Sequence, residues 1–230
     1  NYIPFNYFQK WAEAGLSLAE KSPTLATSYF ESSPATVSKL RSRHLESWAT
    51  LGGSLYRGTW KSSTFASKFF VASPSLVNSL SFSELEQFVG FLDSLSHKSY
   101  DVATECLNLG QKLFPLVGPD KSAVISLAST LVETGWRDVK SFFEAGSRSL
   151  PRIASEERLR FLKMAERLVK SGGNNIPASM LEMSQALAEL DKEKHGNILN
   201  LSETLIDVAP SAVPEFIKSC PVALQRITMV

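Results

Sequence analysis

The sequence predicts an all-α fold, an α-solenoid or superhelix of about six repeats of ~37 residues. Three observations support this prediction. A leucine recurs along the whole chain, a second apolar register follows it at a similar interval, and no stretch of useful length alternates between apolar and polar residues as a strand would. Each repeat is expected to hold a first helix, a second helix and a short third helix. Because one such unit cannot bury its apolar face alone, neighbouring units must stack.

The first helix of each repeat is anchored by a leucine. These leucines are separated by 37, 40, 36, 37 and 37 residues: Leu18, Leu55, Leu95, Leu131, Leu168 and Leu205. The residue four positions earlier is always apolar, so the two share one helical face: Ala14, Leu51, Phe91, Leu127, Met164 and Leu201. The residue three positions earlier is mostly small, as at Gly15 and Gly52, which leaves room for a neighbouring helix.

The second helix of each repeat is marked by a large apolar residue twelve to fifteen positions after the leucine: Phe30, Phe70, Leu107, Phe143, Leu181 and Ile217. One turn earlier, on the same face, are Ala26, Ala66, Ala103, Val139, Pro177 and Val213. Pro177 must lie in the first turn of its helix or break that helix.

A recurring phrase predicts the third element. "SPATVSKL" at 33–40 and "SPSLVNSL" at 73–80 are its clearest copies. Serine followed by proline suits an N-cap and a first helical position. The pattern permits either a separate short helix or a bent continuation of the second helix. The next first helix then begins with its own capping sequence, most clearly "SFSE" at 81–84 and "SEER" at 155–158.

Composition bounds the class of protein. The chain has 230 residues, of which 43% are hydrophobic, enough for a core in a single domain over residues 1–230. The formal net charge is +1, so no global field attracts nucleic acid or an anionic membrane. Cys106 and Cys220 show neither metal-ligand spacing nor a disulfide framework, and no apolar run would span a membrane, which together favour the cytoplasm. The start at Asn1 and the apolar end favour a fragment of a longer multidomain protein.

Part of the sequence resembles the tetratricopeptide family. "WATLGGSL" at 48–55 is similar to its first-helix pattern W-x-x-L-G-x-x-Y, and Ala66-x-x-x-Phe70-x-x-Ser73 is similar to its second helix. The period is longer than that family's 34 residues, its closing proline is absent, and the Ser-Pro phrase intervenes. These departures resemble armadillo or HEAT geometry, in which a repeat can carry three helices.

A second resemblance concerns possible partners. "YFESSP" at 29–34 and "VPEFIKSCP" at 213–221 are similar to the helical region that accompanies von Willebrand A domains in bacterial proteins of the nitric-oxide-reductase-activation type. The metal-binding D-x-S-x-S pattern of such a domain is absent from this sequence. The resemblance therefore implies an adaptor joined to a von Willebrand A domain elsewhere in its chain and working with an ATPase partner.

The sequence contains no recognisable catalytic set, so no enzyme activity, cofactor or metal is predicted. Gly53 and Gly58 have the spacing of a phosphate loop, but Thr59 and Trp60 replace its Lys-Ser/Thr pair, which favours a turn between helices. The three histidines lie near helix boundaries in different repeats and are interpreted as surface or capping residues: His44, His97 and His195.

The candidate binding residues form a ladder at the start of the second helices. Trp60, Tyr100 and Trp136 stand five residues after their leucines. The structural interpretation is that these rings fill the gap between adjoining helical hairpins. The functional interpretation is a protein-binding surface formed with the charged residues that follow: Lys61, Lys68, Asp101, Arg137 and Lys140.

Three functions follow from these patterns. The first is a non-catalytic scaffold that binds another protein or another domain of its own chain. The second is a solenoid that binds or processes nucleic acid with Trp60, Lys61, Trp136 and Arg137, which the near-neutral charge disfavours. The third is a rigid spacer between two domains.

Overall fold

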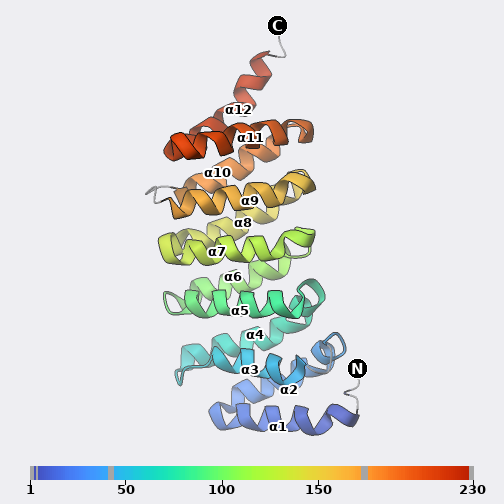
Figure 1. The fold of residues 1–230 in the computed structure, drawn as a ribbon. Coiled ribbons are helices and arrows are strands. Elements are labelled where there is room, and N and C mark those ends of the chain that lie inside the picture. The colour runs from blue at the N-terminus through green and yellow to red at the C-terminus, as the bar shows by residue number, and fades with distance from the viewer. Residues whose placement is uncertain (1–2, 4, 41–43, 172–175, 228–230) are drawn as a thin grey trace. The chain divides into compact units, whose positions relative to one another are not determined.

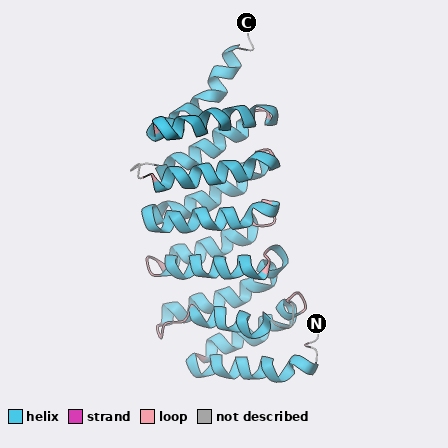
Figure 2. Cartoon of the chain, in the orientation of Figure 1, coloured by secondary structure: helices cyan, strands magenta, loops and turns pink. Residues whose placement is uncertain are grey.

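The computed structural model describes residues 3, 5–40, 44–171 and 176–227, and these residues form helices and short connections without any strand (Figures 1 and 2). The all-α prediction is confirmed. Within the described ranges, no helix is long and apolar enough to cross a membrane. The packing of the backbone divides the chain into two compact units, an N-terminal unit of residues 1–114 and a C-terminal unit of residues 115–230. Whether they form one domain stays a prediction.

The described residues of the N-terminal unit form three pairs of consecutive α-helices. Their bounds are α1 Phe5–Lys21, α2 Pro23–Val37, α3 Leu45–Ser54, α4 Trp60–Ser79, α5 Phe82–Ser96 and α6 Tyr100–Leu113. Helix α1 contacts α3, and α3 contacts α5, while α2 contacts α4, and α4 contacts α6. The helices therefore lie in two rows, with the odd-numbered row in front in Figure 1.

Aromatic rings fill the core between these rows. Trp48 and Phe70 meet edge to face at 5.2 Å, and Tyr29 contacts both rings. The small residues predicted in the first helices have a direct cause here. A Cβ atom on Gly52 would come within 2.1 Å of the Phe70 ring, and one on Gly15 within 2.0 Å of the Phe30 ring. Each glycine thus admits the large residue of the second helix in the same repeat.

The predicted short third helix is not separate in three of the repeats. Pro34, Pro74 and Pro221 lie inside the continuous helices α2, α4 and α12. The serine before the first two prolines is not an N-cap, because its hydroxyl donates to a carbonyl one turn back in the same helix, Ser33 to Tyr29 and Ser73 to Phe69. A mid-helix serine commonly forms this bond to the carbonyl four residues earlier, and the bond often bends the helix.

The C-terminal unit follows the same order of elements, with four short 3₁₀ helices. The α-helices are α7 Lys121–Gly135, α8 Val139–Ser149, α9 Ser155–Lys170, α10 Ile176–Glu189, α11 Lys192–Val208 and α12 Val213–Ile227. The 3₁₀ helices are η2 Gly118–Asp120, η3 Trp136–Asp138, η4 Leu150–Arg152 and η5 Pro210–Ala212. The helices again form two rows, α7 to α9 to α11 and α8 to α10 to α12.

Helix starts agree with the sequence in some places and not in others. Ser81 and Glu84 form the capping box predicted from "SFSE". The prediction from "SEER" is wrong, because α9 begins at Ser155 and its N-cap is Ala154, which makes no side-chain cap. Pro177 lies in the first turn of α10, as required. The side chains of Pro177, Met180 and Leu181 lie outside the described residues, as do Gly173 and Asn174.

In the C-terminal unit, two buried polar side chains occupy a helix position at which α5 has an apolar residue. Arg158 and His195 are the fourth residues of α9 and α11, whereas the fourth residue of α5 is Leu85. The Arg158 guanidinium donates to the carbonyls of Leu150, Val117 and Ile153 and to the carboxylate of Asp120. Arg158 therefore satisfies carbonyls at the turns that precede α7 and α9.

Candidate protein-binding surface

The predicted binding residues fall in both units. Trp60, Lys61, Lys68, Tyr100 and Asp101 belong to the N-terminal unit, on α4 and α6. The other three, Trp136, Arg137 and Lys140, belong to the C-terminal unit, on η3 and α8. We describe each group within its own unit.

Trp60 is the most prominent of them. It is the first residue of α4, and its side chain is 78% exposed. The start of α4 is fixed by a capping box in which the Thr59 hydroxyl accepts from the Ser62 amide and Ser62 bonds the Thr59 backbone. Gly58 precedes it with a φ of 73°, a left-handed conformation that favours glycine. The turn predicted between Gly53 and Trp60 is thus present, and it presents the indole to solvent.

Tyr100 occupies the same register but is packed. It opens α6 behind the Ser99 cap, is half-buried, and meets the Phe65 ring edge to face at 6.0 Å. The interpretation of the ladder as packing therefore describes Tyr100 and does not describe Trp60. Asp101 follows Tyr100 and is exposed.

Trp136 lies in η3, before α8 begins, and is half-buried. The guanidinium of exposed Arg137 sits 5.2 Å from the centre of its indole ring. A cation at this distance is attracted by the ring quadrupole, which holds the arginine over the indole. Lys140, one turn farther on, pairs with Glu144 at 3.9 Å.

Further exposed residues of α4 extend the surface beyond Trp60. Lys61 and Lys68 are both exposed and seven residues apart, so they project from one face. Val71 continues that stripe and is 66% exposed. Sequence analysis missed Val71, although its spacing of three residues from Lys68 was a visible signal. We name Trp60, Lys61, Thr64, Lys68 and Val71 the α4 stripe.

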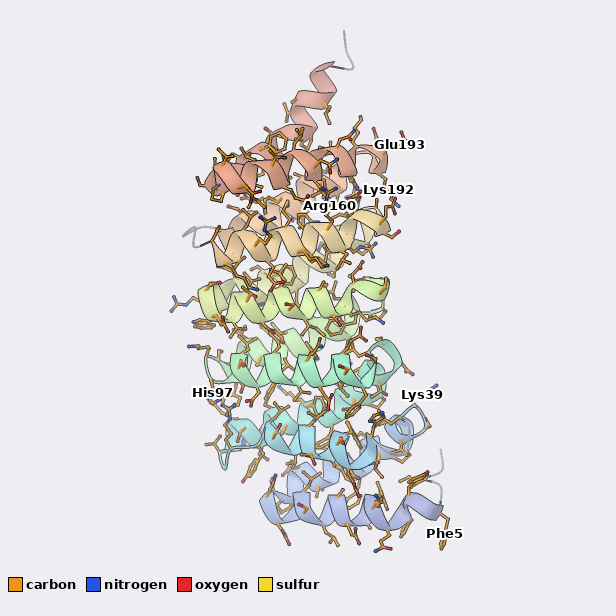
Figure 3. The ribbon with its side chains drawn as sticks, in the orientation of Figure 1. Phe5, Lys39, His97, Arg160, Lys192 and Glu193 are labelled. Carbon is orange, nitrogen blue, oxygen red and sulfur yellow. The ribbon has the colours of Figure 1, made fainter. Side chains whose placement is uncertain are left out.

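Ion pairs join neighbouring helices in both rows of the C-terminal unit, and in the even-numbered row Lys218 of α12 pairs with Glu182 of α10 at 2.8 Å. In the odd-numbered row, Arg160 of α9, labelled in Figure 3, forms a bidentate pair with Glu203 of α11. The hydrogen bond from Arg160 lowers the pKa of Glu203. Arg167 and Asp207 join the same two helices at 2.8 Å. Charges on both rows of this unit therefore bind neighbouring helices to one another.

The N-terminal unit repeats this use of charge in its odd-numbered row. Lys10 of α1 pairs with Glu46 of α3 at 3.0 Å, and Arg57, in the connection that follows α3, pairs with Asp93 of α5. A cavity of about 210 Å³ lies between α1 and α3 beside the first of these pairs. Its lining mixes both signs of charge with small residues: Lys10, Glu13, Ala14, Ser17, Leu18, Lys21, Glu46, Ala49 and Thr50.

The histidines differ from one another. His97 is exposed at the end of α5 (Figure 3), and His44 stacks on Phe82 with ring centres 4.1 Å apart. The surface interpretation is wrong for His195, which is 0% exposed. Its Nδ1 accepts from the Ala154 amide at 3.0 Å, and its Nε2 donates to the Leu190 carbonyl at 3.2 Å. The acceptor role of Nδ1 fixes the neutral Nε2–H tautomer.

The described residues bring together no group of three or more His, Cys, Asp or Glu side chains that could hold a metal ion. Cys106 and Cys220 are both buried free thiols, and burial raises the pKa of Cys220. A raised pKa disfavours the nucleophilic thiolate.

No protein-family model, curated protein or solved structure matches this chain.

Proposed function

We propose that this chain is an α-solenoid of about six repeats that acts as a non-catalytic protein-binding scaffold. Side-chain links that join residues about one repeat apart support the repeating arrangement. In the N-terminal unit, Lys10 pairs with Glu46 and Ser22 bonds Ser63. In the C-terminal unit, such links include Ser149 with Ser184, Ala154 with His195, and Arg167 with Asp207.

The continuous helices α2 and α4 help to choose among the helical-repeat families that the sequence resembles. Since Pro34 and Pro74 lie within α2 and α4, these repeats have two helices and a connection rather than three helices. A two-helix unit resembles tetratricopeptide and HEAT repeats more than three-helix armadillo repeats. We propose this kinship for the repeat architecture alone.

One observation carries the proposed binding role, the exposed Trp60 on a rigidly capped helix beside Lys61 and Lys68. Tryptophan is among the residues that most often dominate binding energy at protein interfaces. The capping box fixes the backbone that carries the indole, so binding has to order only the Trp60 side chain, and more of the contact energy is realised as affinity. The scaffold is proposed to act in the cytoplasm.

The partner class is a protein or another domain of the same chain. The resemblance to the helical region beside von Willebrand A domains makes such a domain, or an ATPase that works with it, the first candidate to test. A nucleic-acid-binding role would require affinity that falls steeply with added salt.

A comparative capture experiment tests the proposal. The chain is immobilised and exposed to extract of the source cells, and retained proteins are identified by mass. Trp60→Ala should lose a protein that the unchanged chain retains. Leu16→Ala is the matched control, because Leu16 is 64% exposed but lies on α1, in the odd-numbered row. Equal retention by all three chains would remove the α4 stripe from consideration and favour the spacer role.

The C-terminal group is tested in the same way. Trp136→Ala combined with Arg137→Ala removes the stacked pair of η3. Loss of the same protein in this variant and in Trp60→Ala would assign both groups to one interaction. Loss in only one variant would assign the binding to that unit.

A further inference from the structure

The charged residues of the α4 stripe are all positive. Helix α4 contains two lysines, Lys61 and Lys68, and no aspartate or glutamate. Both lysines are exposed. Since residues seven apart on a helix are two turns apart, their attachment points are separated by about 10.5 Å along the axis. The stripe thus offers two cations at a spacing that another helix can match with residues two turns apart.

Apolar groups flank these cations. Trp60 lies at the start of the stripe and is 78% exposed, and Val71 lies beyond Lys68 and is 66% exposed. Thr64, half-buried between the two lysines, is small enough to let a ligand side chain approach the helix. A ligand must therefore combine carboxylates with apolar side chains on one face.

The neighbouring helices limit the width of the basic stripe. Helices α2 and α6 both pack against α4. Their exposed charges are mostly acidic, Glu31 on α2 and Asp101 and Glu105 on α6, with Lys112 at the far end of α6. A broad anionic surface, such as a nucleic-acid duplex or a membrane, would meet these carboxylates as well as the lysines. A single narrow segment lying along α4 would avoid most of that repulsion.

We propose that the α4 stripe binds one acidic amphipathic segment of a partner protein, with carboxylates two helical turns apart and a bulky apolar side chain beside them. This inference rests on the proposed protein-binding function and specifies its ligand. The carboxylates pair with Lys61 and Lys68, and the apolar side chain packs on Trp60.

A peptide-display selection on the full chain tests the inference and requires no identified partner. A library of random peptides is enriched on the immobilised chain, and the affinity of the enriched peptides is then measured for each variant. Enriched peptides should carry a net negative charge and at least one large apolar residue. Trp60→Ala should weaken them by about 30-fold, the effect of an interface hot spot.

Charge reversal gives the decisive comparison. Lys61→Glu with Lys68→Glu should weaken acidic peptides by up to about 25-fold through loss of the two pairs, since each exposed pair contributes up to about fivefold in affinity. Lys163→Glu, on exposed Lys163 of α9, is the matched control and should leave affinity unchanged. The double reversal should also gain affinity for peptides whose Asp and Glu are replaced by Lys.

The outcomes separate the inference from the proposed function. Peptides that depend on Trp60 but carry net positive charge would overturn the acidic ligand and leave the binding surface in place. Peptides that bind all variants equally would overturn both. Enrichment of no peptide, together with salt-sensitive binding of single-stranded oligonucleotides, would overturn both in favour of nucleic acid.

Discussion

The indole Nε1 of Trp48 donates a hydrogen bond of 2.9 Å to the Oγ of Ser73 within the core of the N-terminal unit. Trp48 belongs to α3 and Ser73 to α4, so this bond joins the two helices of one hairpin. The Ser73 hydroxyl in turn donates to the Phe69 carbonyl at 2.8 Å. One serine thus supplies an acceptor to the indole and a donor to its own helix.

Ser73→Ala should destabilise the N-terminal unit by about 1–3 kcal/mol, because the buried Trp48 N–H would lose its only described acceptor. The free energy of unfolding in urea measures this loss. Ser54→Ala is the control, since the Ser54 hydroxyl is exposed and bonds the nearby Leu51 carbonyl of its own helix. A Ser73→Ala variant as stable as the control would contradict the assigned role of this bond.

Two glycines should respond to alanine in opposite directions. Gly52→Ala would place a Cβ 2.1 Å from the Phe70 ring, so the ring must move and the core must repack. We expect a loss of about 1–3 kcal/mol. Gly90, inside α5, has nothing within 4 Å of its added Cβ. Gly90→Ala should therefore stabilise by about 0.5–1 kcal/mol through helix propensity.

Thermal unfolding followed by circular dichroism compares the two variants. A decrease in Tm for Gly52→Ala with an increase for Gly90→Ala is the expected pattern. A decrease for both would mean that Gly90 meets a neighbour on substitution, and no change for Gly52→Ala would contradict the close approach of Phe70.

His195 should matter far more than His97. His195→Phe would leave the Ala154 amide and the Leu190 carbonyl without their partner in a fully buried site. The expected loss is about 3 kcal/mol of unfolding free energy. His97→Phe changes an exposed side chain and should stay within about 0.5 kcal/mol of the original. Chemical denaturation of both variants provides the comparison, and equal effects would contradict the buried geometry.

The pair of Arg160 and Glu203 should give stability that depends on pH. The hydrogen bond from Arg160 lowers the pKa of Glu203 in the folded chain. Its contribution is therefore present above the unfolded pKa of about 4.3 and is lost as the pH falls through the folded pKa. Because both side chains are about one-third exposed, the contribution at neutral pH is below about 1 kcal/mol.

Glu203→Gln should remove this acid-sensitive contribution. Urea unfolding measured between about pH 3 and 7 should show a smaller loss of stability for the variant than for the unchanged chain. Glu193→Gln, on exposed Glu193 at the start of the same helix, serves as the control (Figure 3). The prediction fails when Glu203→Gln keeps the original acid sensitivity.

The periodic leucines predicted the helical class and the apolar face because both depend on local spacing along one helix. Five of the six leucines are buried, as that spacing requires: Leu18, Leu55, Leu95, Leu131 and Leu168. The prediction is wrong for the last repeat, where Leu205 is half-buried and Leu201 is 60% exposed. Gly15 and Gly52 were also recognised as sites of close approach, although their aromatic partners became visible only in the structure. Such agreement is expected where local pattern and tertiary packing favour the same conformation.

The failures arise where a side chain finds a partner in another helix or along its own. The Ala154 amide donates its hydrogen bond to His195, which is 41 residues away in the sequence. A local sequence pattern cannot show such a partner, so it could not predict that Ala154 is the N-cap of α9. The Ser-Pro phrase gave a wrong N-cap prediction, because the same two residues can stand at the start of a helix or inside one, where the serine bonds a carbonyl of the preceding turn. At the candidate surface, Trp60 and Tyr100 share a register, but Phe65 covers only Tyr100.

The placement of Ser33 and Ser73 has a consequence for cell signalling. Both precede proline, the pattern that proline-directed kinases recognise, and both are 0% exposed inside continuous helices. A kinase needs its acceptor hydroxyl free and its substrate segment extended, and the folded chain provides neither at these serines. A phosphate found on either residue would therefore mark chains modified before folding or during local unfolding.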